Sequence, residues 1–122
     1  MKIRFIRLTK SELITEAIED RILPAISKFS DIRHKDIVTE IAMENSPHQA
    51  GRNLFRVKIK IVRGKMRGFT LEKSDISFYR ALANITTSLP STIKKFRSKK
   101  QGKALKQLRR FKDALPLYLS ST

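Results

Sequence analysis

The sequence predicts an α+β domain with the element order βαβββα, in which two helices pack on one face of a four-stranded, mainly antiparallel sheet. Four short segments alternate apolar and polar residues, as strands with one open face do. Two longer segments carry apolar residues at helical spacing, and most of these segments are separated by residues typical of loops. We expect the domain to span residues 1–97, followed by a basic tail over residues 98–122 that is disordered or forms a short amphipathic helix.

The N-terminal part of the chain predicts one strand and one helix. Residues 2–8 alternate and form the strand. Thr9 and Glu12 have the spacing of a capping box, so we expect a helix to begin there and to end near residues 30–31. Pro24 lies within this helix and predicts a kink or a break, because proline removes a backbone hydrogen bond. The apolar stripe of the helix consists of Ile14, Ile18, Ile22, Ala25, Ile26 and Phe29.

Residues 36–44 form the second predicted strand. Its outward side is expected to carry Glu40 and Glu44, exposed to solvent. Residues 45–51 form a loop by composition. The inward side of the strand consists of Ile37, Thr39, Ile41 and Met43.

Residues 54–62 give the clearest strand pattern, with Phe55, Val57, Ile59 and Ile61 on one side and Arg56, Lys58 and Lys60 on the other. Gly64-Lys65 predicts a tight hairpin turn, after which residues 66–72 return as the fourth strand.

The second helix is expected to begin after the possible caps in residues 74–77. Pro90 interrupts its apolar stripe, and residues 105–115 have the spacing for one more amphipathic helix within the tail. The stripe of the second helix consists of Phe78, Leu82, Ile85, Leu89, Ile93 and Phe96.

Positive charge is concentrated in one half of the chain. Residues 1–51 hold eight Lys or Arg and eight Asp or Glu, whereas residues 52–122 hold nineteen bases and three acids, which gives the whole net charge of +16. Such a concentration of charge opposes compaction and predicts a polyanionic partner. Nucleic acid is the first candidate, because each neutralised phosphate releases a bound counterion.

Two clusters of bases are the candidate RNA-binding residues, although a face that only aids solubility is the alternative. If about 8 phosphates are engaged, the log–log salt slope of the affinity should be near −7. Phe5, Phe55, Phe69 and Phe78 are assigned to the core, so recognition of structured RNA by shape and phosphates is favoured over stacking on single-stranded bases. The clusters are Arg56, Lys58, Lys60, Arg63, Lys65 and Arg67, and Lys94, Lys95, Arg97, Lys99 and Lys100.

The sequence contains no pattern that predicts an enzyme, a cofactor site or a metal site. There is no cysteine, and His34 and His48 fall in separate predicted loops. Glu40 and Glu44 have the pattern of a carboxylate pair, but pairing with Arg56, Lys58 or Arg4 across the strands is the simpler interpretation. The N-terminus lacks the apolar stretch of a signal peptide, and no run is long enough to span a membrane, so we expect a cytoplasmic protein.

Three short segments resemble the ribosome hibernation-promoting factors, the ribosome-associated translation inhibitors also called sigma-54 modulation proteins. They are residues 13–18 (LITEAI), Lys28-Phe29, and residues 78–82 (FYRAL). The resemblance covers about residues 1–100. It implies a fold related to double-stranded-RNA-binding domains and binding of the small ribosomal subunit and its rRNA in the channel for mRNA and tRNA. The resemblance further implies that the protein blocks translation during stress or stationary phase.

The sequence departs from the family pattern in the second helix. Ser77 stands where the family typically has an acidic residue, and Ser88 where it has a lysine, with Pro90 close by. This shifts the expected RNA contacts toward the helix end, the hairpin and the tail. The tail is too short to be the dimerising domain of the long family members, and the sequence leaves self-association open.

Three alternatives remain. A general structured-RNA-binding protein or RNA chaperone would bind free RNA as tightly as ribosomes. A nuclease would need Glu40, Glu44 or Glu72 beside the basic surface. A membrane or protein-interaction module acting through the tail would lose all binding when residues 101–122 are deleted.

Overall fold

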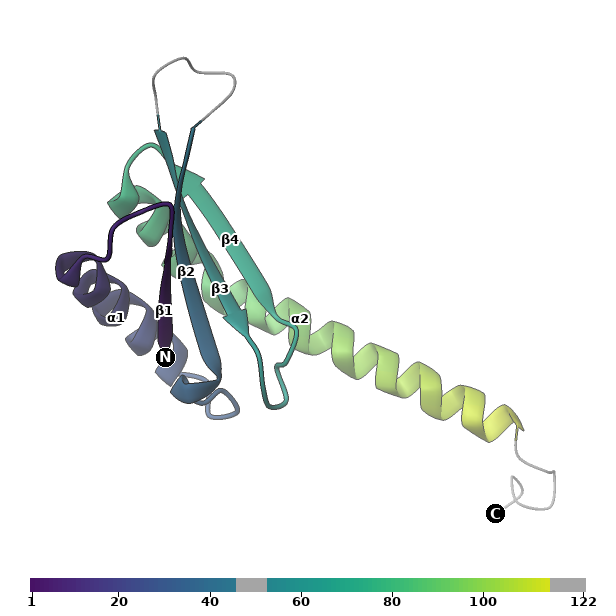
Figure 1. Ribbon diagram of the computed structural model, residues 1–122. Coiled ribbons are helices and arrows are strands. Elements are labelled where there is room, and N and C mark those ends of the chain that lie inside the picture. The colour runs from purple at the N-terminus through teal and green to yellow at the C-terminus, as the bar shows by residue number, and fades with distance from the viewer. Residues whose placement is uncertain (46–52, 115–122) are drawn as a thin grey trace.

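The computed structural model describes residues 1–45 and 53–114 of the chain (Figure 1). Its elements follow the predicted order βαβββα, with a short 3-10 turn over His34–Asp36. They are β1 (Lys2–Ile6), α1 (Glu12–Ser27), β2 (Ile37–Asn45), β3 (Asn53–Ile61), β4 (Thr70–Asp75) and α2 (Phe78–Ala114).

The four strands form one mixed sheet in the order β1-β2-β3-β4. β1 runs parallel to β2, and the β2–β3 and β3–β4 pairs are antiparallel. Both helices cover the same face of this sheet, and the other face is open (Figure 1). The predicted α+β class, the mainly antiparallel sheet and the placement of the helices are therefore confirmed.

The core lies between the sheet and the two helices. Thr39 is fully buried there, and its hydroxyl contacts the sulfur of Met1 at 3.2 Å. The expected stripes of both helices face this core, and Phe29 and Phe96 pack at its margin. The largest fully buried side chains are Phe69, Ile18, Ile22, Ile26, Ile37, Ile41, Ile59, Met66, Leu82, Ile85, Leu89 and Ile93.

α1 begins and ends differently from the prediction. Its N-cap is Ser11 rather than Thr9, and the Ser11 hydroxyl accepts a hydrogen bond from the Ile14 N–H at 3.4 Å. The helix ends at Ser27, where the backbone turns so that the Phe29 N–H donates to the Ile26 carbonyl. Pro24 does not split the helix, because it is exposed in the last turns while neighbouring residues on the buried side hold the helix to the core.

The connection between β3 and β4 is longer than the predicted two-residue turn. It spans residues 62–69, here called the β3–β4 loop, and Gly64 and Gly68 adopt positive φ angles of 83° and 94°. Met66 is only 2% exposed, so it anchors this loop in the core instead of opening the fourth strand. β4 consequently begins at Thr70, four residues later than predicted from the sequence.

α2 continues through Pro90 to Ala114, so the expected interruption and the separate tail helix are not observed. Leu89 and Ile93 flank the proline and are fully buried, which holds the helix against the sheet on both sides of it. The last part of α2 projects beyond the sheet (Figure 1). The boundary at residues 97 and 98 lies inside this helix and stays a prediction, and the predicted loop over residues 45–51 lies almost entirely outside the described residues.

Across residues 1–45 and 53–114, none of the helices combines the length and the apolar character that crossing a bilayer requires.

Replacement of Leu89 by alanine tests the contact between α2 and the core. Leu89 is fully buried, so Leu89→Ala should lower the free energy of unfolding by about 2–5 kcal/mol, measured by urea denaturation. The matched control is Leu13→Ala, because Leu13 is 74% exposed on α1, and its effect should stay within about 0.5 kcal/mol. Equal unfolding midpoints for the two variants would contradict the described packing.

Candidate nucleic-acid interface

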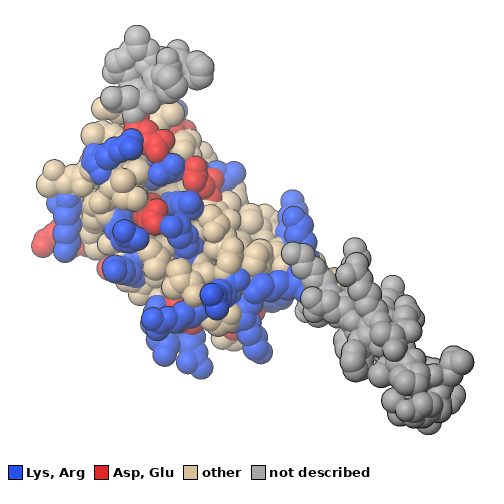
Figure 2. All heavy atoms as spheres, turned by 45° about the vertical axis from the view of Figure 1, so that its right-hand side comes forward, with Lys and Arg blue, Asp and Glu red and all other residues tan. Residues whose placement is uncertain are grey.

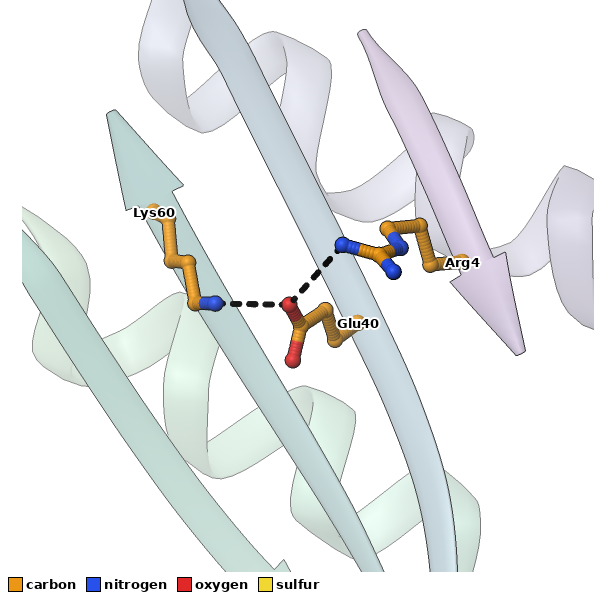
Figure 3. A network of polar contacts seen from close by, with 3 residues as sticks. All are labelled: Arg4, Glu40 and Lys60. Atoms are coloured by element: carbon orange, nitrogen blue, oxygen red, sulfur yellow. Dashed lines mark hydrogen bonds and ion pairs between the residues drawn. The ribbon is translucent and has the colours of Figure 1, made fainter. Parts of the chain in front are cut away.

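The open face of the sheet carries a three-residue ion network formed by Arg4, Glu40 and Lys60 (Figure 3). Arg4 lies opposite Glu40 in the parallel pair of β1 and β2, and Lys60 reaches it from β3. The Lys60 ammonium donates a hydrogen bond of 2.7 Å to the Glu40 carboxylate, and the Arg4 guanidinium lies 3.9 Å from the same oxygen. Glu40 is only 8% exposed, so the expectation that it is an exposed residue is wrong. Neighbouring side chains cover it although it lies on the solvent side of the sheet.

The network keeps Glu40 ionised. The hydrogen bond from Lys60 is the largest influence and holds the pKa of the Glu40 carboxyl below its ordinary value of 4.5. Burial of Glu40 acts in the opposite direction, while the charges of Lys60, Arg4 and Lys58 lower the pKa further. Because the pKa is lowered in the folded state, the network stabilises the fold above pH 4.5 and loses this contribution as the pH falls through the folded-state pKa.

The other strand bases are also opposed by acids. Arg56 forms an ion pair of 2.9 Å with Glu44, and Lys58 lies in register with Glu40 on one side and Glu72 on the other. These contacts match the ion-pair interpretation of Glu40 and Glu44 rather than a catalytic one. The open face is therefore mixed in charge, and Arg56, Lys58 and Lys60 bring less free positive charge than their sequence run suggests.

The Arg97 side chain joins α2 to the segment that follows α1. Its guanidinium pairs with Asp31 at 2.6 Å and lies 5.5 Å from the centre of the Phe29 ring. The Nε of Arg97 is buried without a hydrogen-bond partner among the described residues. Arg97 thus holds together α2 and the α1–β2 connection (residues 28–36), and its charge is offset by Asp31 although the side chain is partly exposed.

Lys100 holds the β3–β4 loop to α2. Its ammonium donates hydrogen bonds of 2.8 Å and 3.0 Å to the carbonyls of Lys65 and Arg67, and it lies 5.1 Å from the centre of the Phe96 ring. The loop is thereby fixed next to the end of the helix that carries the second basic cluster. Two elements that are distant in the sequence form one surface.

The remaining bases at this end of the body are exposed, and none of them forms an ion pair with an acid among the described residues. Figure 2 shows Lys and Arg gathered near the region from which α2 projects. We call these residues the basic end. They are Arg33, Lys35, Arg63, Lys65, Arg67, Lys94, Lys95 and Lys99.

The basic end includes two residues, Arg33 and Lys35, that are not among the candidates predicted from the sequence. Arg33 and Lys35 belong to the half of the chain that has no net charge, so the concentration of bases that marks the other candidates does not include them. The signal in the sequence was a pair of bases flanking His34 between a predicted helix and a strand. Their placement beside Arg63 and Lys65 follows from the fold and could not be read from the local sequence.

The histidines and acids do not form a metal site within the part of the chain that is described. The Nε2 of His34 lies 3.1 Å from the Ser27 hydroxyl, which gives the ring a local partner. His48 lies outside the described residues.

No family model and no curated protein matches the sequence, but solved structures match its fold. The N-terminal domain of Protein Y from Thermus thermophilus matches with a TM-score of 0.51 and 13% sequence identity, over 79% of this chain and 96% of that chain. The chain has the fold of the Protein Y domain. The resemblance to the hibernation-promoting factors is thereby confirmed for the fold, because Protein Y belongs to that family. A ribosomal subunit interface protein from Coxiella burnetii matches with a TM-score of 0.47 and 11% identity, over 80% of this chain and 96% of that one.

Replacing Lys60 with methionine should raise the pKa of Glu40. Lys60→Met removes the hydrogen bond that most lowers this pKa and leaves the opposing effect of burial. Lys58→Met is the matched control, because Lys58 lies on the same strand and acts on Glu40 only weakly through its charge. Carboxyl NMR titration should show a larger shift for Lys60→Met, and equal shifts would show that the network in Figure 3 is not formed in solution.

Loss of the Lys100 ammonium should loosen the β3–β4 loop. Lys100→Met removes both hydrogen bonds to the loop carbonyls, so exchange of the Gly68 and Phe69 amide protons should become several-fold faster. Lys99→Met is the control, because Lys99 is exposed one position earlier on α2. Exchange as slow as in the unmodified protein would mean that Lys100 does not hold the loop.

Proposed function

We propose that the protein binds the small ribosomal subunit in the channel for mRNA and tRNA and blocks translation there during stress or stationary phase. The observation that carries this proposal is the combination of the Protein Y fold with a cationic end that is fixed by internal contacts. The mechanism is steric, because the domain occupies the space that mRNA and tRNA need. No bond is made or broken, so no catalytic residue and no cofactor is required.

The geometry suits contact with the phosphates of folded RNA. Exposed bases of the basic end come from the α1–β2 connection, the β3–β4 loop and α2, so they can contact several backbone segments at once. Arginines bind phosphate through two parallel hydrogen bonds, and lysines act as point charges. The ties made by Arg97 and Lys100 hold these elements in place before binding, which limits the conformational entropy lost on association.

Recognition by base stacking has little support on the open face of the sheet. Phe69 and Phe78 are buried, and Phe5 and Phe55 pack against the core on the helix side. A sheet that binds single-stranded RNA by stacking presents aromatic rings to the bases. This protein presents ion pairs there, so the proposed contact uses shape and phosphates.

The candidate residues from the sequence divide into two groups in this proposal. The exposed bases of the basic end, which form no ion pair with an acid among the described residues, are proposed as the main phosphate ligands. They are the predicted residues Arg63, Lys65, Arg67, Lys94, Lys95 and Lys99, joined by Arg33 and Lys35. The remaining candidates have internal contacts or acids opposite them and are proposed to contribute less. These are Arg56, Lys58, Lys60, Arg97 and Lys100.

Co-sedimentation with separated ribosomal subunits tests the proposal. At about 0.1 M salt the protein should sediment with the small subunit, and at about 0.5 M salt it should be released, because phosphate contacts weaken steeply with salt. Bound mRNA and tRNA should compete with it. Equal binding to both subunits and to bare RNA would instead identify a general structured-RNA-binding protein or RNA chaperone.

Two double variants test which bases carry the affinity. Lys95→Gln/Lys99→Gln removes two exposed charges without an internal partner among the described residues and should weaken subunit binding about tenfold or more. Arg56→Gln/Lys58→Gln removes the same charge from the open face and should weaken binding less, because acids already oppose these bases. A larger loss for the second variant would place the interface on the sheet and overturn the proposed division.

A further inference from the structure

A cavity of about 460 Å³ lies between the α1–β2 connection and the β3–β4 loop. Four bases line it: Arg33 and Lys35 from the connection, and Arg63 and Lys65 from the loop. The volume falls within the range of about 300–1,000 Å³ that is common for small-ligand sites. Its lining differs from most such sites in being strongly charged, which points to an anionic ligand.

The acids of this cavity do not cancel its positive charge. Asp31 is paired with Arg97 at 2.6 Å, so its charge is already neutralised by a residue of α2. Asp36 is only 7% exposed and lies next to Gly64, where a carboxylate oxygen would be 3.3 Å from a Cβ atom on that glycine. None of the four bases forms an ion pair with an acid among the described residues. Four free cations therefore face one largely buried carboxylate.

The cavity is built by contacts that do not need a ligand. The Val62 N–H donates a 2.9 Å hydrogen bond to the Asp36 carbonyl and joins the loop to the connection. Lys100 fixes the loop to α2 through the Lys65 carbonyl, and Gly64, with its φ of 83°, turns the chain at the cavity wall. A site that is held open in this way binds a ligand with a smaller loss of conformational entropy.

We propose that this cavity is a binding site for a pair of neighbouring phosphate groups. Arg33 and Arg63 would each hold a phosphate through two hydrogen bonds, and Lys35 and Lys65 would add point charges. The two phosphates belong either to a sharply bent RNA backbone or to a free polyphosphate. This site is defined by its own residues and goes beyond the proposed binding to the ribosome, which does not require a preformed anion pocket.

The test uses the full chain and inorganic pyrophosphate, at constant ionic strength set with sodium chloride. NMR should show saturable shifts of the Lys35, Gly64 and Lys65 amide signals. Arg33→Gln/Arg63→Gln should weaken pyrophosphate binding about a hundredfold or abolish it, because each charge-assisted contact contributes about tenfold or more. The matched control is Lys10→Gln/Arg80→Gln, which removes two exposed charges near the N-termini of α1 and α2 and should bind as the unmodified protein does.

Two results would overturn the proposal. One is the absence of saturable shifts at these amides in the unmodified protein, a readout that does not depend on any variant folding. The other is equal pyrophosphate affinity in the pocket variant and its control. Failure of the protein to bind ribosomes would leave both measurements unchanged, so the two proposals fail separately.

A second experiment, a competition between pyrophosphate and RNA, identifies the source of the phosphates. The affinity for a structured RNA fragment is measured with and without saturating pyrophosphate at the same ionic strength. Weaker RNA binding in its presence assigns the cavity to the RNA backbone, and unchanged RNA binding assigns it to a free polyphosphate. Both outcomes support a phosphate site in this cavity.

Discussion

The packing of the apolar stripe of α2 against the sheet determines where the exposed bases of the protein lie. Leu82, Ile85, Leu89 and Ile93 are each at most 2% exposed, which fixes both the position and the rotation of the helix. Residues 94, 95 and 99 then have to face solvent, because they occupy the other sides of the same helix. The end of this stripe, Phe96, also contacts Phe69, the last residue of the β3–β4 loop, with ring centres 5.6 Å apart. One hydrophobic interface therefore aligns the helix, the loop and the charges that both carry.

The charged residues divide according to what they contact within the molecule. Lys60 and Arg56 pair with acids on β2, and Arg97 pairs with Asp31, so these bases contribute to the structure of the domain. The Lys100 ammonium donates hydrogen bonds to two backbone carbonyls. The total of 27 Lys and Arg residues consequently overstates the number of bases that are free to bind a partner. Eight of the exposed bases without an ion pair among the described residues form the basic end, where the two loops and α2 meet. Their grouping makes this part of the surface strongly cationic.

Most of the fold could be predicted from the sequence because its signals are local. Alternation marked the strands, and helical spacing marked both stripes that form the core. The errors arose where tertiary contacts outweighed local preferences. Pro24 predicted a kink or a break and Pro90 an interruption, yet both helices continue through these residues, and Leu89 and Ile93 pack in the core on either side of Pro90. Met66 sits in the core instead of starting a strand.

The site was predicted less well than the fold, for a related reason. The sequence predicted that Glu40 and Glu44 pair with bases across the strands, but only the register of β2 and β3 decides that the partner of Glu44 is Arg56. The pairing of Arg97 with Asp31 joins residues far apart in the sequence, and the meeting of Arg33 with Arg63 also depends on the packing of two loops. Such long-range pairings follow from the complete fold, and no local pattern in this sequence encodes them.

The unbroken course of α2 has a consequence for how the protein tolerates insertions. Each residue of an α-helix advances the chain by about 1.5 Å and turns it by about 100°. An extra residue after Ile93 would rotate everything that follows relative to the sheet, so Phe96 would leave the core and Arg97 would turn away from Asp31. The same insertion in a surface loop would be absorbed locally. In this protein the number of residues between the core stripe and the bases of α2 therefore determines the direction in which these bases face. A continuous helix cannot compensate for a change in that number.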